Sequence, residues 1–206
     1  HDGQLGSAIC LPFVLPISAM RGVLNVGRLR GGPGFARSDV EMLGIVCAQM
    51  AAAIANTRLY SAIVEKSREL EESQFDSIKS LAQAIEAKDD YTGGHCDRLI
   101  DFALEMAREL GLMANETDHL KYAAALHDMG KIGIGETILN KPARLTPEEY
   151  EVMKNHVRKG AEILSQVKFL SPVIPLIYHH QEWFDGSGYP DGLQGDAIPL
   201  GARIVA

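Results

Sequence analysis

Hydrophobic positions near the start of the chain fall in two short runs of β-prone residues. Residues 8–15 and 22–29 are rich in Val, Leu and Ile, and Pro16, Ser18 and Arg21 lie between them. Two such runs separated by turn-forming residues predict a pair of strands joined as a hairpin. The Gly-rich residues that follow, 31–34, predict a turn that ends this small sheet.

The pattern then changes to helical spacing over a long stretch, for which Ser38 is the expected N-cap. Apolar residues recur every three or four positions through an Ala-rich segment, at Val40, Leu43, Val46, Cys47, Met50 and Ile54. The helical pattern continues into residues 65–72, where charged residues dominate and no Gly or Pro interrupts. We expect residues 59–76 to form a connecting helix, with a solvated helix face and a dimeric coiled coil as open alternatives.

From Ser77 onward the pattern predicts only helices, joined by short loops that contain Gly and Pro. Apolar residues at helical spacing mark residues 78–85, 99–110 and 120–127. Thr146, Pro147 and Glu149 supply the N-cap, first-position proline and capping box of another helix. A last helix is expected to begin at Ser171 and to end near residue 180. The fold class is therefore expected to be mainly α, with an all-α second half.

Composition indicates a globular protein rather than a disordered one. Hydrophobic residues make up 46% of the 206 residues and charged residues 23%. The net charge of −7 argues against binding to a nucleic acid polymer, because such proteins need a basic patch that neutralises phosphates. A small anionic substrate would need a local source of positive charge, which bound metal ions would supply.

Cysteine usage and hydropathy predict a cytoplasmic chain. The three cysteines, Cys10, Cys47 and Cys96, are far apart and form no CxxC motif, so we expect no disulfide framework. The longest apolar stretch near the start, residues 8–17, contains two prolines and is too short to span a bilayer, so we expect no membrane segment in this chain. The chain opens on His1 rather than Met, which leaves room for an anchor or sensor upstream.

Six of the seven histidines lie in the predicted helical half, and five of these six are candidate ligands that mostly continue an apolar helix face. They are His95, His127, His156, His179 and His180. A single inward histidine is more often a hydrogen-bonded core residue than a metal ligand. Several buried imidazoles without partners would be costly, however, whereas a shared metal ion satisfies them together. The sequence therefore predicts a metal site built from these side chains.

A carboxylate and a lysine lie close to one of these histidines in the sequence. Asp128 follows His127 directly, at the end of an Ala-rich predicted helix, so its carboxylate could bridge two divalent ions while the imidazole binds one. Gly130 is expected to turn the chain sharply and to bring Lys131 close to the same site.

The order of these motifs resembles the HD superfamily, and its HD-GYP branch in particular, over residues 77–206. The matching segments are AKDDYTGGHCDRL, ALHDMGKIGI, ILNKPARLTPEEYEVMKNH and HHQEWFDGSGYPDGLQGDAIPLGARI. Gly188, Tyr189 and Pro190 form the motif that gives the branch its name. Composition alone would make this segment an ordinary surface loop. The resemblance implies instead that the loop lies beside the metal centre and helps to form the substrate pocket or a contact with diguanylate cyclases.

The resemblance also implies a phosphodiesterase that hydrolyses the bacterial second messenger cyclic di-GMP to pGpG, GMP or both. Two divalent ions, iron or manganese, would be held by His127, Asp128, His156 and His180, with Asp128 as the bridge. Asp128 and Lys131 are the implied catalytic residues, since the ions activate a shared water and Lys131 contacts a phosphate oxygen. The implied substrate-binding residues are Lys131, Gly188, Tyr189 and Pro190.

Three departures from the family pattern limit how far the family's site residues can be assigned to this sequence. Some relatives hold three metals with a Glu four residues before the first histidine, but Tyr91 stands there, which makes His95 a weaker candidate ligand. Counting back from Asp185, the family's His pair aligns with His180 and Gln181, which leaves His179 one step upstream. The sequence stops before the family's last Asp ligand, so we expect a domain truncated at its C-terminus.

Residues 1–58 resemble the C-terminal half of a GAF sensory domain, through SAICLPFVLPISAMRGVLNVGR and the helix that follows it. The resemblance implies a partial α+β GAF-like domain, followed by the connecting helix and the HD-type domain. It also implies a homodimer formed through the GAF-like piece and the connecting helix.

Three other functions stay open on the sequence. A degenerate HD-GYP module would bind cyclic di-GMP or a partner without turnover, as Gln181 favours. An HD-type hydrolase of other nucleotides or phosphoesters is a second alternative, which the intact Gly188, Tyr189 and Pro190 disfavour. A dimer in which only the architecture matters is a third, and it would not need to bind metal.

Overall fold

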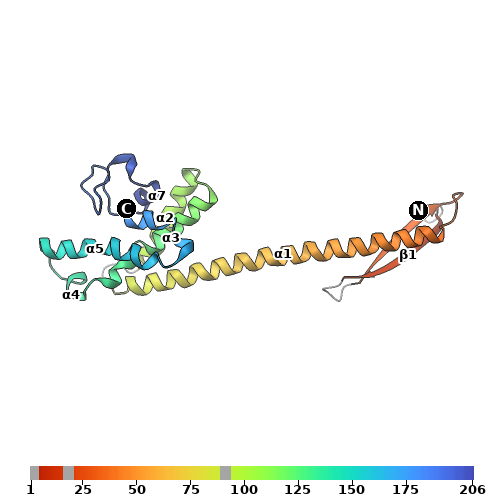
Figure 1. Ribbon diagram of the computed structural model, residues 1–206, viewed down its shortest axis with the longest axis horizontal. Helices are drawn as coiled ribbons and strands as arrows, with labels where there is room; N and C mark the ends of the chain where they lie inside the picture. The colour runs from red at the N-terminus through yellow and green to blue at the C-terminus, as the bar shows by residue number, and fades with distance from the viewer. Residues whose placement is uncertain (1–4, 16–20, 89–93) are drawn as a thin grey trace. The chain divides into compact units, whose positions relative to one another are not determined.

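The computed structural model describes residues 5–15, 21–88 and 94–206 (Figure 1). The turn predicted around Pro16 and Ser18, and the comparison at Tyr91, lie outside the described residues. The chain forms two compact units, His1–Glu71 and Glu72–Ala206.

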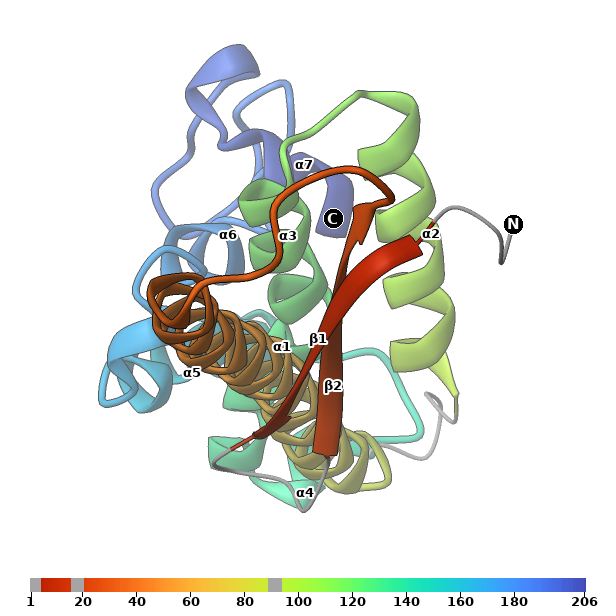
Figure 2. The same cartoon turned by 90° about the vertical axis from the view of Figure 1, so that its right-hand side faces the viewer.

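The first unit contains the predicted hairpin. Strands β1 (Leu5–Val14) and β2 (Arg21–Leu29) pair antiparallel in a two-stranded sheet, which Figure 2 shows as two adjacent ribbons. Exposed and half-buried residues alternate along β2, as expected for a strand whose side chains point to opposite faces. The hairpin is consistent with a GAF-like fragment, but two strands do not identify that domain.

Helix α1 (Arg37–Glu86) follows the sheet as one uninterrupted helix. Ser38 is not its N-cap. The carboxylate of Asp39 instead accepts hydrogen bonds from the N–H of Ala36, at 2.9 Å, and from Arg28, at 3.0 Å. The separate helix expected from residue 78 is the end of α1, because residues 45–86 contain no Gly or Pro that would break it.

By length and composition alone, α1 could cross a membrane. One such helix is weak support for a span, because helices of soluble proteins pass the same test. The absence of a membrane segment therefore stays a prediction.

All regular structure in the described part of the second unit is helical, as predicted. After α1 come α2 (His95–Glu109), α3 (Ala114–Leu126), η1 (Met129–Gly133), α4 (Glu136–Leu139), α5 (Pro147–Leu164), η2 (Lys168–Leu170), α6 (Ile174–Tyr178), η3 (Gly195–Ala197) and α7 (Leu200–Val205). Helix α5 begins with the predicted capping box, in which Thr146 and Glu149 each accept the other's backbone N–H. Helix α6 begins three residues later than expected, because Ser171 ends the short helix η2.

Helix α3 lies at the centre of the second unit and packs against α2, α6 and α7 (Figure 2). Its Ala123 and Ala124 are fully buried, and their small side chains allow neighbouring helices to approach closely. Leu120 and Leu126 of the same helix are 1% exposed. The core therefore fixes the C-terminal end of α3, which is where the predicted metal-binding dipeptide begins.

Candidate metal centre

His127 and Asp128 follow the buried end of α3. Nε2 of His127 lies 3.1 Å from Oδ2 of Asp128. Two residues later, a Cβ atom on Gly130 would lie 1.8 Å from the carbonyl oxygen of His156, so η1 packs directly on the backbone of α5. Gly130 does not have the positive φ of a sharp glycine turn. Its role is this close approach, which corrects the expectation from the sequence.

The close packing of η1 on α5 brings two further histidines to Asp128. Nε2 of His156, on α5, lies 3.6 Å from Oδ1 of Asp128 and 3.4 Å from Nε2 of His180, which follows α6. One ligand atom from each of these three residues lies within 4.8 Å of the others. The ring centroid of His127 is 5.3 Å from that of His180. His127, Asp128, His156 and His180 are called the cluster below.

The three histidines of the cluster share one orientation. Nδ1 lies 2.9 Å from the carbonyl oxygen of Ala124 in His127, 2.9 Å from that of Met153 in His156, and 2.6 Å from that of Ile177 in His180. A carbonyl oxygen only accepts, so each Nδ1 carries a proton, and Nε2 is the ring atom that remains for a metal when the imidazole is neutral. The Nε2 atoms of His127 and His156 face the carboxylate of Asp128, and histidines that bind divalent metals are oriented by backbone carbonyls in the same way.

The electrostatics of the cluster suit a cation. Burial lowers the pKa of His156, and it lowers the pKa of His180 to about 3, so both imidazoles are neutral. Burial opposes ionisation of Asp128, but the neighbouring His127 and Lys131 outweigh it and hold the pKa of that carboxyl well below its usual range. Burial also opposes the charged form of His127, yet Asp128 raises the pKa of that imidazole. A buried carboxylate with two neutral imidazoles and a third imidazole beside it is a donor set that fits divalent transition metals.

A cleft of about 460 Å³ opens onto the cluster, a volume within the range of small-molecule sites, roughly 300–1,000 Å³. Besides the cluster, its walls include His95, Arg98, Lys131, Gln181 and Tyr189. Nζ of Lys131, on η1, lies 3.0 Å from Oδ2 of Asp128. The cleft therefore joins the candidate ligands to cationic groups and to an aromatic side chain.

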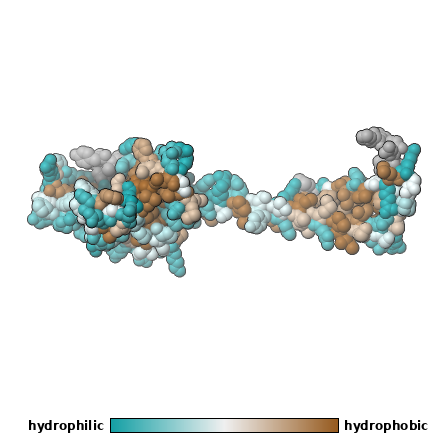
Figure 3. All heavy atoms as spheres, turned by 90° about the horizontal axis from the view of Figure 1, so that it is seen from above, coloured by the Kyte–Doolittle hydropathy of each residue, from teal (hydrophilic) through white to brown (hydrophobic). Residues whose placement is uncertain are grey.

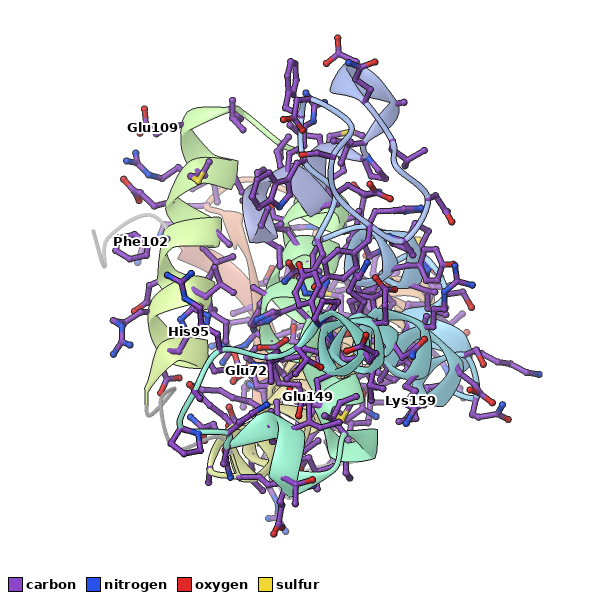
Figure 4. All side chains as sticks on the ribbon, turned by 90° about the vertical axis from the view of Figure 1, so that its left-hand side faces the viewer. Glu72, His95, Phe102, Glu109, Glu149 and Lys159 are labelled. Atoms are coloured by element: carbon purple, nitrogen blue, oxygen red, sulfur yellow. The ribbon has the colours of Figure 1, made fainter. Side chains whose placement is uncertain are left out.

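His95 is the first residue of α2 (Figure 4). It is one of the residues that line the cleft. Its ring centroid is 5.7 Å from that of His127, but none of its atoms belongs to the closest group of ligand atoms. Its backbone N–H donates to Oε1 of Glu86, at 2.7 Å. His95 is thus beside the cluster rather than within it.

The structure turns His179 away from the cluster. Nε2 of His179 lies 3.1 Å from Oδ2 of Asp191, and its Nδ1 lies 2.9 Å from the carbonyl oxygen of Pro175. Consecutive residues at a helix end point in directions about 100° apart, so only one of the adjacent histidines can face the cluster. That residue is His180, and Gln181 lines the cleft next to it.

The loop with the Gly-Tyr-Pro motif contributes one residue to the cleft. Tyr189 is on the wall, with its ring centroid 6.4 Å from that of His156. Gly188 lies behind the wall, because a Cβ atom there would be 2.2 Å from the backbone nitrogen of Trp183. Pro190 is half-buried and lies outside the cleft wall.

Sequence reasoning missed one residue near this site. Glu182 is 3% exposed, which is rare for a glutamate. Its only sequence signal was its place directly after the histidine pair and Gln181, and nothing in the helical periodicity singled it out.

The sequence is similar to several curated phosphodiesterases. The chain is 46% identical over 140 residues to the cyclic di-GMP phosphodiesterase response regulator RpfG of Xanthomonas campestris, covering 67% of this chain and 37% of that protein. It is 39% identical over 171 residues to 3'3'-cGAMP-specific phosphodiesterase 2 of Vibrio cholerae, covering 82% of this chain and 31% of that protein. This chain therefore spans about a third of the length of these curated relatives.

A solved structure shares the fold. It is a cyclic GMP-AMP specific phosphodiesterase of V. cholerae, with a TM-score of 0.52 and 21% identity over 64% of this chain and 38% of that one. The HD domain family matches residues 79–206, which is more than half of the sequence. On this match and on the histidine–aspartate pair at the end of α3, the chain belongs to the HD domain family.

Proposed function

We propose that this chain is the catalytic part of a bacterial signalling phosphodiesterase and that it hydrolyses a cyclic dinucleotide. The observation that carries the proposal is the set of three buried histidines that line one cleft together with Asp128, each with its Nδ1 atom held by a backbone carbonyl. The relatives named above act on cyclic di-GMP or 3'3'-cGAMP, which supports the substrate class. Cyclic di-GMP is the proposed substrate, and pGpG, GMP or both are the proposed products.

The cluster would hold two divalent ions, with iron or manganese as the proposed metals. When bound, such ions supply a nucleophilic water at neutral pH and stabilise the charge that builds on phosphorus. The two oxygens of Asp128 face different histidines, His127 and His156, which suits a bridging carboxylate. The ammonium of Lys131 balances the charge of Asp128 and is placed to contact a phosphate oxygen.

The remaining cleft wall would bind the rest of the substrate. Tyr189 offers an aromatic surface for a base, since stacking of a base on an aromatic ring is worth roughly 1–3 kcal/mol. Gly188 and Pro190 would act through the loop that presents Tyr189. Arg98, on α2, adds a second cation to the wall besides Lys131 on η1.

The proposal is tested by metal content and cyclic di-GMP turnover of the His127→Ala and Asp128→Ala variants. Asp118→Ala, an exposed carboxylate on α3, is the matched control. We expect both cluster variants to lose metal and turnover while the control keeps them. Variants that keep full turnover would refute the assignment.

A second candidate is a degenerate module that binds cyclic di-GMP without hydrolysing it. The observation that favours it is Gln181 on the cleft wall, because an amide is a poorer metal ligand than the imidazole of the family's histidine pair. Tight cyclic di-GMP binding by the metal-loaded protein with no product would select this candidate.

For the domain organisation we propose a GAF-like fragment at residues 1–58, a connecting helix at 59–76 and the HD-GYP domain from 77 to 206. The hairpin followed by a long helix supports the first assignment. We also propose a homodimer through this region, because the described part of α1 leaves apolar residues exposed at helical spacing, and apolar surface is visible in Figure 3. These residues are Met42, Ile45, Leu59, Ile63 and Leu70.

Two further proposals concern partners and location. Trp183 and Phe184 are 62% and 65% exposed next to the Gly-Tyr-Pro loop, which supports a contact there with a diguanylate cyclase domain. A cytoplasmic location is proposed because the described cysteines are all free and the proposed substrate is an intracellular messenger.

A further inference from the structure

The buried carboxylate of Glu182 uses both of its oxygens on the loop that follows the Gly-Tyr-Pro motif. Oε1 accepts the backbone N–H of Asp191 at 2.7 Å, and Oε2 accepts the backbone N–H of Leu193 at 3.0 Å. Hydrogen bonds to an ionised acceptor are stronger than neutral ones, and an unpaired buried carboxylate would be very costly. Glu182 and this loop therefore hold each other in place.

Three more contacts join the same two segments. The backbone N–H of Tyr189 donates to the carbonyl oxygen of Gln181, at 3.0 Å. His179 reaches Asp191 through its Nε2 atom, at 3.1 Å. Gly188 lies so close to the backbone nitrogen of Trp183 that no side chain fits between them. Residues 179–183 thus anchor the loop on both sides of Tyr189.

The anchoring segment also contains His180 of the cluster. Its neighbours in sequence, His179 and Glu182, point to the loop, whereas His180 points to Asp128 and His156. One short segment therefore fixes a candidate metal ligand and, at the same time, the aromatic residue on the cleft wall.

We infer that Glu182 is a positioning residue, which acts by holding Tyr189 on the wall of the cleft, and that His179 is the second anchor of the same loop. The kinetic part of this inference rests on the proposed phosphodiesterase function. Its structural part concerns the loop alone and can be tested without turnover.

The first test is hydrogen exchange in the metal-loaded protein, comparing Glu182→Gln with the parent. The glutamine keeps the size of the side chain but places an NH₂ group against a backbone N–H, so one of the two bonds is lost. We expect the amides of Asp191 and Leu193 to exchange about tenfold faster, while metal content stays unchanged. Glu162→Gln, at an exposed glutamate of α5, is the matched control and should leave these amides unchanged. Unchanged exchange in Glu182→Gln would overturn the inference.

The second test is a double-mutant cycle on cyclic di-GMP hydrolysis with Glu182→Gln and Tyr189→Ala. If Glu182 acts through Tyr189, Glu182→Gln alone raises KM about tenfold with a smaller change in kcat, and it adds little in the Tyr189→Ala background. Additive effects would show general damage and would contradict a positioning role.

His179→Ala provides a second test in case the Glu182 variant does not fold. His179 is only half-buried, so its truncation should be tolerated better. The variant should also raise the hydrogen-exchange rate of the backbone amide of Asp191 and leave the metal content unchanged. Loss of metal would contradict the assignment of His179 as an anchor. A parent protein that hydrolyses no cyclic dinucleotide would refute the proposed function, while the exchange measurements would still decide the role of Glu182.

Discussion

Both compact units contain helices rich in Ala and other apolar residues, but they use these residues differently. In Glu72–Ala206, Ala123 and Ala124 of α3 are fully buried between neighbouring helices. In His1–Glu71, Met42 and Ile63 of α1 are 60% and 65% exposed. Helical periodicity thus shows which residues share a face, but it does not show what covers that face. The closed core of the second unit is what allows side chains from separate helices to meet in one cluster.

The largest expected effect comes from adding a side chain at Gly130, where η1 packs directly on the backbone of α5. Gly130→Ala places a methyl group against the backbone of His156, which cannot move away as a flexible side chain could. We expect a loss of about 3 kcal/mol or more in the free energy of unfolding, together with loss of metal binding. Chemical denaturation and metal analysis measure both.

Gly135→Ala is the control for this change, because a Cβ atom there meets nothing closer than 3.8 Å and the backbone is extended. It should leave stability and metal binding near those of the parent. A stable Gly130→Ala variant with full metal content would show that the close packing does not build the site.

Truncating one apolar side chain in each unit tests whether that side chain is covered by neighbouring helices. Leu120→Ala, at a fully buried position of α3, should lower the free energy of unfolding by about 2–5 kcal/mol. Ile63→Ala, at an exposed position of α1, should leave unfolding of the second unit unchanged and weaken self-association instead. Denaturation and sedimentation measure these two quantities. Equal losses of stability would remove the distinction between a closed core and an exposed helix face.

A smaller effect is expected at the start of α5, which carries His156. Thr146→Ala removes the oxygen that accepts the N–H of Glu149 and should cost about 0.5–2 kcal/mol in the free energy of unfolding. Thr146→Ser keeps the cap and is the matched control. Metal content should stay unchanged in both, since the first turn of α5 lies two turns before His156.

Sequence signals predicted the local parts of the structure well. The hairpin, the capping box of α5 and the all-helical second half depend on nearby residues, and the structure contains them. Ser38 was assigned wrongly as an N-cap because a carboxylate one residue later, on Asp39, also reaches the helix start and pairs with Arg28. That choice depends on a contact between a strand and a helix, which periodicity does not report.

The sequence separated the roles of adjacent residues in the candidate site only in part. Counting back from Asp185 favoured His180 over His179 as a ligand, but the contact of His179 with Asp191 follows from the rotation at the end of α6 and was not predicted. Glu182 was missed for the same reason, since its partners lie nine and eleven residues away on a loop. Long-range packing decides these roles, and no local pattern encodes it.

A metal-dependent phosphodiesterase site built on His180 rather than His179 is tested by metal content and cyclic di-GMP turnover of His180→Ala and His179→Ala. We predict that His180→Ala loses metal and turnover, whereas His179→Ala keeps its metal and its kcat with a raised KM. Full metal content and turnover in His180→Ala, or loss of metal in His179→Ala alone, would contradict the assignment of His180 as the ligand.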